Sequence, residues 1–168
     1  MERYALTGTP GTGKTTISGL LNNKIISLSD YYEKFSDGKG DDGEWIVNVN
    51  DLNSSIRDLE WEIAEGNFSH RLNVINKAIV LRCDPVVLAK RLKERNYSNQ
   101  KIRENLEAEA MGIIFSETMK YYANENLIQL DTTQKSAKEC AEIISDFIDN
   151  NIKVEEEIDY SERILDWY

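Results

Sequence analysis

The sequence predicts one α/β domain in which a parallel sheet is covered by helices on both faces. Three observations support this prediction. The 168 residues suffice for one domain and leave no room for a second full one. Strand-like and helix-like patterns alternate along the chain, as they do in parallel sheets. A glycine-rich segment, residues 8–15, separates the first strand pattern from the first helix pattern.

The first half of the chain contains short strand patterns separated by polar segments. Ile17, Leu20 and Leu21 share one face of the first helix. Residues 36–43 hold three glycines and three aspartates, so we expect a mobile loop there. Asn50 or Asp51 is the expected cap of the second helix. In chain order we predict strands over 3–7 and 24–28, a helix over 14–22, a short strand over 44–49, a helix over 50–60 and a weak strand over 60–65.

The second half has clearer patterns. Asp84 followed by Pro85 is typical of a helix start, with aspartate as the cap and proline in the first turn. In the last helix, apolar residues recur on one face, which is typical of a helix packed on a sheet. We predict a strand over 77–83, a helix over 85–95, a polar turn over 96–99, a long helix to about 124, a strand over 127–130 and a helix over 136–150.

Composition and charge narrow the function classes. With 30 acidic and 20 basic residues, the net charge of −10 argues against direct nucleic-acid binding, which needs a basic surface. A basic protein partner, or a nucleotide in a locally positive pocket, stays possible. Cys83 and Cys140 are the only cysteines and form no C-x-x-C pair, which argues against a zinc site. Without a long apolar run, the chain is expected to be cytoplasmic and free of membrane segments.

The segment Gly8-Thr9-Pro10-Gly11-Thr12-Gly13-Lys14-Thr15 matches the phosphate-loop pattern G-x-x-x-x-G-K-[ST] at every fixed position. Its glycines allow successive N–H groups to converge on phosphate oxygens. Lys14 is expected to reach the β- and γ-phosphates, and the Thr15 hydroxyl to ligate Mg²⁺. A chance glycine turn is the alternative, but the position between strand and helix favours nucleotide binding.

Three further side chains are candidates for the same chemistry. Glu65 ends the weak third strand, where a carboxylate can hold the water shell of Mg²⁺; the alternative is a solvated loop acid. Arg91 and Arg95 lie one helical turn apart and could stabilise charge on a transferred phosphoryl group, or merely extend from a solvated face. Arg95 is favoured because it stands where helix becomes turn. His70 is left unassigned.

Two other features have structural explanations. Trp45 and Trp61 flank the predicted helix over 50–60, and we expect both in the core. The tail, residues 151–168, has four more acids than bases and interleaves them with apolar residues. We expect it to pack as a last helix; the alternative is an acidic-aromatic surface for a basic partner.

Several segments, in order, resemble the family of adenylate kinase isoenzyme six, also called the coilin-interacting nuclear ATPase family, in its archaeal form. The resemblance covers about residues 3–150, and the stretch 80–109 is its most specific part. The segments are residues 8–16, Leu28-Ser29-Asp30, Glu65-Gly66, Val80-Leu81-Arg82-Cys83-Asp84-Pro85, residues 91–97 and Asn105-Leu106-Glu107-Ala108-Glu109.

The resemblance implies a P-loop NTPase of the nucleoside monophosphate kinase type, with a five-stranded parallel sheet in a domain over 1–150. It implies a monophosphate-binding region over 27–50 and a short lid over 94–104, with Lys14, Arg95 and Glu65 as catalytic residues and Thr15 and Glu65 (through water) as the Mg²⁺ site. Residues carried over for ATP are Gly11, Gly13, Lys14, Thr15, Thr16 and Arg95, and those of the AMP region are Asp30, Lys34 and Arg57.

The resemblance also implies activities and a partner. The family is associated with Mg²⁺-dependent adenylate kinase and ATPase activity, and with small-ribosomal-subunit maturation through a basic platform ribosomal protein. The chain is then a monomer or a complex with that protein. Two positions depart from the family pattern: Asn67 replaces a usual histidine, and Glu33 replaces a common arginine. An ATPase switch acting on a ribosomal protein is the alternative function. A module that binds nucleotide only structurally is disfavoured by Lys14 and Thr15.

Overall fold

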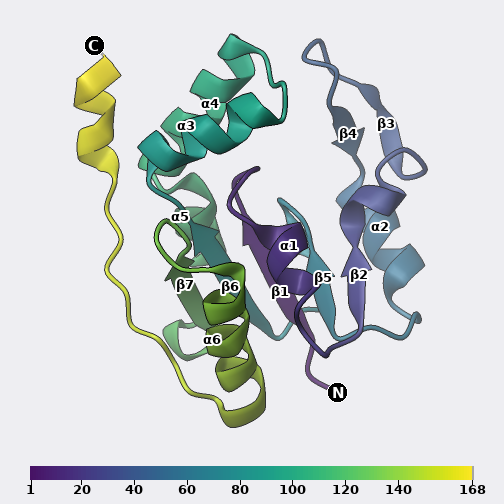
Figure 1. The fold of residues 1–168 in the computed structure, drawn as a ribbon. Coiled ribbons are helices and arrows are strands. Elements are labelled where there is room, and N and C mark those ends of the chain that lie inside the picture. Colours follow the sequence, from purple (N-terminus) through teal and green to yellow (C-terminus); the bar gives the residue numbers. More distant parts are fainter. Residues whose placement is uncertain (168) are drawn as a thin grey trace.

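The computed structural model describes residues 1–167 and contains a five-stranded sheet in the order β2-β5-β1-β6-β7 (Figure 1). Every neighbouring pair in this sheet is parallel, which confirms the predicted fold class. The glycine-rich segment therefore follows the central strand, β1. The strands are β1 (Tyr4–Gly8), β2 (Ile25–Ser27), β5 (Ile63–Glu65), β6 (Lys77–Arg82) and β7 (Leu127–Asp131).

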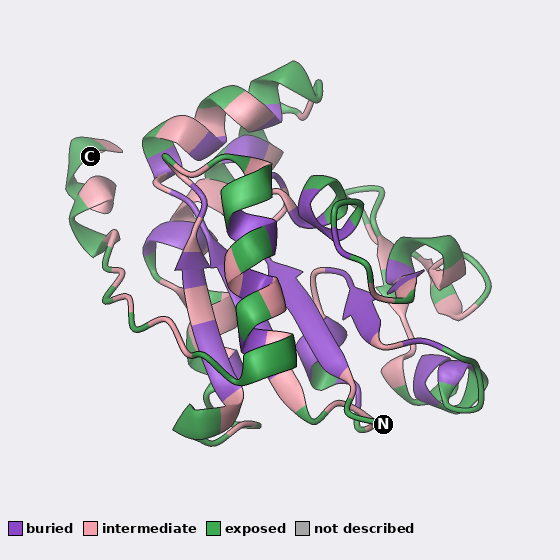
Figure 2. Cartoon of the chain, turned by 60° about the horizontal axis from the view of Figure 1, so that its bottom comes forward, coloured by how far each residue is buried: buried purple, intermediate pink, exposed green. Residues whose placement is uncertain are grey.

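Helices cover both faces of the sheet, because successive side chains of each strand point to opposite sides. Leu6 faces α1 (Lys14–Ser18) and α6 (Ala137–Asn150), whereas Ala5 faces α5 (Ile113–Thr118). A separate cluster around Trp61 packs α2 (Val49–Ile56) beside β2 and β5. Figure 2 shows the consequence: the strands are buried and the outward helix faces are exposed. The helix predicted over 14–22 is shorter than expected and ends at Ser18.

The segment after β2 differs from prediction. The expected mobile loop over 36–43 is wrong in part, because β3 (Ser36–Lys39) pairs antiparallel with β4 (Trp45–Val47) as a hairpin. Asn48 caps α2 by accepting from the Asp51 N–H at 3.2 Å, so neither predicted cap is correct. Trp61 is buried as expected. Trp45 is only half-buried, and the Lys39 ammonium lies 4.5 Å from its ring centre.

Two helices form an arm above the sheet's carboxyl edge (Figure 1). They are α3 (Pro85–Glu94) and α4 (Asn99–Ala110). Asp84 caps α3 as predicted, accepting from the Val86 N–H at 2.9 Å. The long helix predicted to reach residue 124 is wrong: Gly112 adopts a left-handed conformation with φ 61°, which separates α4 from α5 and turns the chain back onto the sheet. Short 3-10 turns complete the chain at Leu28–Tyr31, Ser69–Arg71 and Asn124–Asn126.

The tail is not the expected last helix. Asn151 ends α6 in a left-handed conformation with φ 52°, and residues 152–160 then run extended beside the edge strand β7. A 3-10 turn, η4 (Ser161–Trp167), follows next to α4 (Figure 1). Tyr168, the last residue of the predicted extension, lies outside the described residues. Within residues 1–167, none of the helices has the length and apolar character needed to cross a bilayer.

Candidate active site

The carboxyl ends of β1, β2 and β5 meet the end of α3 around a pocket of about 160 Å³. Of the predicted site residues, Gly11, Gly13, Lys14, Thr15, Glu65 and Arg95 line it together. The structure therefore gathers the phosphate loop, the acid and the favoured arginine in one place, although the chain separates them by up to 84 positions. The remaining lining residues are Pro10, Ser29, Tyr32, Gly66, Asn67 and Tyr97.

The phosphate loop owes its shape to glycine. Gly13 has φ 108°, a conformation that other residues adopt only under strain. Gly11 has φ 89° and also packs closely on the arm, because a Cβ there would lie 2.9 Å from Leu88 Cδ1. Glycine at position 11 thus serves both the loop and its contact with α3.

Lys14 is buried beneath the loop. Its Nζ donates hydrogen bonds to the carbonyl oxygens of Gly8 (2.7 Å) and Thr9 (3.1 Å). Burial lowers the pKa of Lys14 to about 8, while Glu65 opposes and Arg95 adds to this effect. Backbone carbonyls thus hold the Lys14 ammonium at the wall of the pocket. Phosphate oxygens could take the place of these carbonyls as its hydrogen-bond acceptors.

Glu65 is oriented by two hydroxyl groups. Thr15 Oγ1 donates to one carboxylate oxygen at 2.9 Å, and Ser27 Oγ donates to the other at 3.0 Å. Only 6% of Glu65 is exposed, so its direction is well defined. A hydroxyl and a carboxylate side by side are oxygen donors of the type that Mg²⁺ takes alongside phosphates and water. These residues fit the ion. Ser27 was not predicted as a partner of Glu65.

Arg95 borders two cavities. It lines the phosphate pocket and a neighbouring cavity of about 270 Å³ between α1, α3 and the segment after β7. Thr16 lines the second cavity but not the phosphate pocket. Thr132, Lys135 and Cys140 also line the second cavity. The guanidinium stands at the exposed end of α3, where it can face charge in either space.

Arg91 lines the second cavity with Arg95 but does not line the phosphate pocket. It donates to the Gly11 carbonyl at 3.3 Å and to the Thr132 carbonyl at 3.0 Å. Its side chain therefore ties the phosphate loop to the segment after β7, and it does not extend from a solvated face.

The predicted AMP residues are not brought to the pocket. Asp30 and Lys34 are exposed and absent from its lining, and the Lys34 ammonium lies 5.2 Å from the centre of the Phe35 ring. Arg57 lies at the opposite edge of the sheet, where its carbonyl accepts from Arg3 at 2.9 Å just before β1. From the same part of the chain, Ser29 and Tyr32 line the pocket instead.

Two buried groups support the loop from behind. Glu109 of α4 accepts hydrogen bonds from Thr9 Oγ1 (2.6 Å), Arg82 Nε (2.8 Å) and the Cys83 N–H (3.0 Å). His70 Nδ1 lies 3.0 Å from Thr7 Oγ1 in β1, below the pocket rather than in it. Sequence reasoning missed the role of Glu109, although the residue belongs to a segment that carries the family resemblance.

Comparisons with known proteins agree with this geometry. Residues 5–112 match a family model described as "AAA domain". A protein of Thermococcus kodakarensis named "Putative adenylate kinase" is 40% identical, over 89% of this chain and 86% of its own. A protein of Halobacterium salinarum with the same name is 36% identical, over 89% and 91%. The chain belongs to this archaeal kinase family.

Solved structures show the fold of this kinase family in more distant proteins. A shikimate kinase from Acinetobacter baumannii superimposes with a TM-score of 0.58 at 18% identity, covering 90% of this chain and 94% of its own. A Thermus thermophilus protein, TT1252, gives a TM-score of 0.53 at 10% identity, covering 88% and 96%. The P-loop kinase-like fold predicted from the sequence is thus confirmed, and family membership makes the chain a nucleotide kinase.

Proposed function

We propose that this kinase transfers the γ-phosphoryl group of ATP to AMP in the presence of Mg²⁺ and also hydrolyses ATP slowly. The observation that supports this proposal is the convergence of Lys14, the Thr15–Glu65 pair and Arg95 on one pocket. The relatives named for adenylate kinase activity favour ATP and AMP as substrates.

The roles of the residues follow from their places. The triphosphate occupies the loop formed by Gly11, Gly13 and Lys14, and the nucleoside occupies the second cavity beside Thr16 and Arg95. An oxygen of the AMP phosphate forms a bond to the γ-phosphorus, the bond from that phosphorus to the β,γ-bridging oxygen breaks, and two ADP molecules result. Lys14 and Arg95 stabilise the charge that spreads over the oxygens. Bound Mg²⁺, held by Thr15 and by Glu65 through water, would supply further neutralising charge.

The acceptor belongs on the side of residues 27–50. There the β3–β4 hairpin faces the lid, residues 94–104, across a cavity of about 840 Å³ that an ion pair between Glu44 and Lys101 bridges. Movement of the hairpin and the lid relative to each other would open this side to AMP and then exclude water.

A second candidate, an ATPase switch or a nucleotide-dependent chaperone of a ribosomal protein, has its own supporting observation. The cations among the described residues that line the phosphate pocket are Lys14 and Arg95, and both are engaged by the ATP roles above. The acceptor side has Glu33 where an arginine is common, and Arg57 does not line the cavity between the hairpin and the lid. A weakly held AMP would leave water as the acceptor.

Parallel assays on one preparation distinguish the two candidates. ADP formed from ATP plus AMP measures the kinase, and phosphate released from ATP alone measures the ATPase. AMP-dependent ADP formation at least tenfold faster than phosphate release would support the kinase. Phosphate release that AMP does not suppress, without AMP-dependent ADP formation, would support the switch. A chain without either activity would contradict both.

We also propose a role in small-ribosomal-subunit maturation and rRNA processing, in the cytoplasm, through a basic platform ribosomal protein. The net charge of −10 suits such a partner. Four exposed acids on or next to the hairpin form a candidate contact: Asp37, Asp41, Asp42 and Glu44. The test is capture of the purified ribosomal protein at low salt, with and without ATP. Neutralising the four acids should weaken capture, and undiminished capture would place the contact elsewhere.

A further inference from the structure

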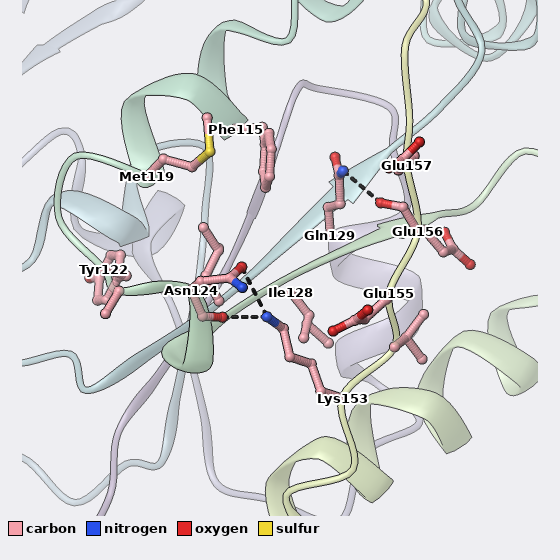
Figure 3. A pocket seen from close by; sticks show the side chains of 13 residues that line it. Phe115, Met119, Tyr122, Asn124, Ile128, Gln129, Lys153, Glu155, Glu156 and Glu157 are labelled. Atoms are coloured by element: carbon pink, nitrogen blue, oxygen red, sulfur yellow. Dashed lines mark hydrogen bonds between the residues drawn. The ribbon is translucent and has the colours of Figure 1, made fainter.

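The C-terminal tail is fastened to the wall of the second cavity. It leaves α6 at the amino edge of the sheet, follows β7 and reaches the arm at the carboxyl edge (Figure 1). Between its contacts it spans a cavity of about 740 Å³, lined by Phe115, Met119 and Ile128 among others (Figure 3). The tail is therefore held by three separate sets of contacts along β7.

Near its start, the tail is anchored at the amino end of β7, whereas the phosphate loop lies at the carboxyl edge of the sheet. The Lys153 ammonium donates to Asn124, to the side-chain oxygen at 3.0 Å and to the carbonyl oxygen (Figure 3). This anchor lies just before the beginning of β7.

The middle anchor is Glu156. Its carbonyl accepts from Gln129 Nε2 at 2.8 Å (Figure 3). Its carboxylate accepts from the Asp131 N–H and from Lys135 Nζ, both at 2.8 Å. The ion pair is partly buried, with the two side chains 21% and 32% exposed, and Glu156 raises the pKa of Lys135 above its usual value.

The upper anchor joins the same segment to the arm. The Tyr160 hydroxyl donates to the Asp131 carboxylate and lies 3.3 Å from Thr133 Oγ1. Arg163 donates to the Asp84 carboxylate at 2.6 Å, at the cap of α3. The segment after β7 is thus held between the tail on one side and the phosphate loop on the other, where Thr132 Oγ1 donates to the Thr12 carbonyl at 2.8 Å.

We infer that the tail positions the nucleotide: Glu156 and Tyr160 hold residues 131–135 so that Lys135 and Thr132 shape the cavity for the nucleoside of ATP. This inference rests on the proposed function, which places the nucleoside in that cavity. Glu156 lines neither the phosphate pocket nor the second cavity, so it is a positioning residue that acts through Lys135 and the Asp131 backbone. The tail then determines how tightly ATP binds, and leaves the transfer step to Lys14, Glu65 and Arg95.

The test is steady-state kinetics of the full-length Glu156→Gln variant beside a matched control. The control is Glu155→Gln, which removes the same charge from the exposed neighbouring residue of the tail. Glu156→Gln should raise the KM for ATP by about threefold or more, with kcat within about twofold, because a positioning contact for ground-state binding is lost. Glu155→Gln should change neither. Tyr160→Phe, which removes one hydroxyl and keeps the ring, should also raise KM.

A second comparison tests the route through Lys135. In a Lys135→Met background, Glu156→Gln should have a smaller effect on KM than in the unmodified chain, because coupled residues are not additive. Equal KM values for Glu156→Gln and Glu155→Gln would overturn the inference, as would a fall in kcat at unchanged KM. An equilibrium measurement of ATP binding separates the two proposals. If the unmodified chain failed to bind ATP, the proposed function itself would fail. If the unmodified chain and Glu156→Gln bound ATP with equal affinity, only the role of the tail would be overturned.

Discussion

Thr9 and Glu109, 100 positions apart in the chain, share a buried hydrogen bond of 2.6 Å. Thr9 belongs to the phosphate loop, and Glu109 lies in the last turn of α4, the helix whose first half belongs to the predicted lid. The same carboxylate neutralises Arg82, which is 3% exposed. The bond therefore connects the arm, the sheet and the phosphate loop through one buried acid.

This connection predicts a stability effect. Thr9→Val should lower the free energy of unfolding by about 1.5–3 kcal/mol, the range for a hydrogen bond to a charged group. Glu109→Ala should lower it by about 3–5 kcal/mol, because it leaves the Arg82 charge buried and unpaired. Urea unfolding measures both. Glu104→Gln, on the exposed side of α4, is the control and should stay within about 0.5 kcal/mol. Similar losses for all three variants would contradict the special role of Glu109.

Lys14→Ala should abolish turnover while leaving the fold intact. Among residues 1–167 its ammonium donates to the backbone carbonyls of Gly8 and Thr9, so its loss removes a charge that phosphate needs rather than an apolar core contact. The rate should fall by about 10²-fold or more. Turnover is measured by ADP formation, and circular dichroism checks the fold. Undiminished turnover would contradict the assignment of residues 8–15 as the phosphate-binding loop.

Arg95→Ala should reduce the rate more than it weakens ATP binding. The side chain borders both cavities, so it can meet charge that develops between the phosphoryl group and its acceptor. The measurement compares the ATP dissociation constant with kcat/KM in the same variant. Equal factors would mean that Arg95 binds only ground-state ATP.

Glu65→Gln should raise the Mg²⁺ concentration needed for half-maximal activity and lower kcat. The amide keeps the shape of the side chain but loses the negative charge that would hold the water shell of Mg²⁺. Ser27→Ala, which removes one hydroxyl from the carboxylate, should shift the Mg²⁺ requirement in the same direction by less. Titration of activity with Mg²⁺ measures both shifts, and an unchanged requirement in Glu65→Gln would exclude Glu65 from the Mg²⁺ site.

The lowered pKa of Lys14, about 8, predicts two pH effects with opposite signs. Between about pH 8 and 10.5 the folded state has lost a proton that the unfolded state keeps. The contribution of Lys14 to the free energy of unfolding therefore rises with pH in this window, as the cost of burying the ammonium disappears. ATP affinity should instead fall above pH 8, by up to about tenfold per pH unit, because phosphate needs the charged form. Calorimetry should detect proton uptake on binding at pH 9, and its absence would contradict the assignment.

Features that depend on neighbouring residues can be predicted from the sequence. The phosphate loop, the cap of α3 at Asp84, the buried strands and the family resemblance all follow from patterns that span a few positions. The meeting of Lys14, Thr15 and Glu65 in one pocket could be predicted because parallel strands deliver their carboxyl ends to one edge.

Contacts between residues far apart in the chain depend on the three-dimensional arrangement of the helices and strands. Arg57 lies at the wrong edge of the sheet, Arg91 braces the phosphate loop, and the tail runs along β7 instead of forming a helix. The break at Gly112 also depends on distant packing, because the chain must turn there for α5 to cover the sheet. Ser27–Glu65, Thr9–Glu109 and Lys135–Glu156 are pairs without a local pattern. Each forms because folding brings the two side chains together. Where a member of the pair is buried, as Glu65 and Glu109 are, it must find a polar partner.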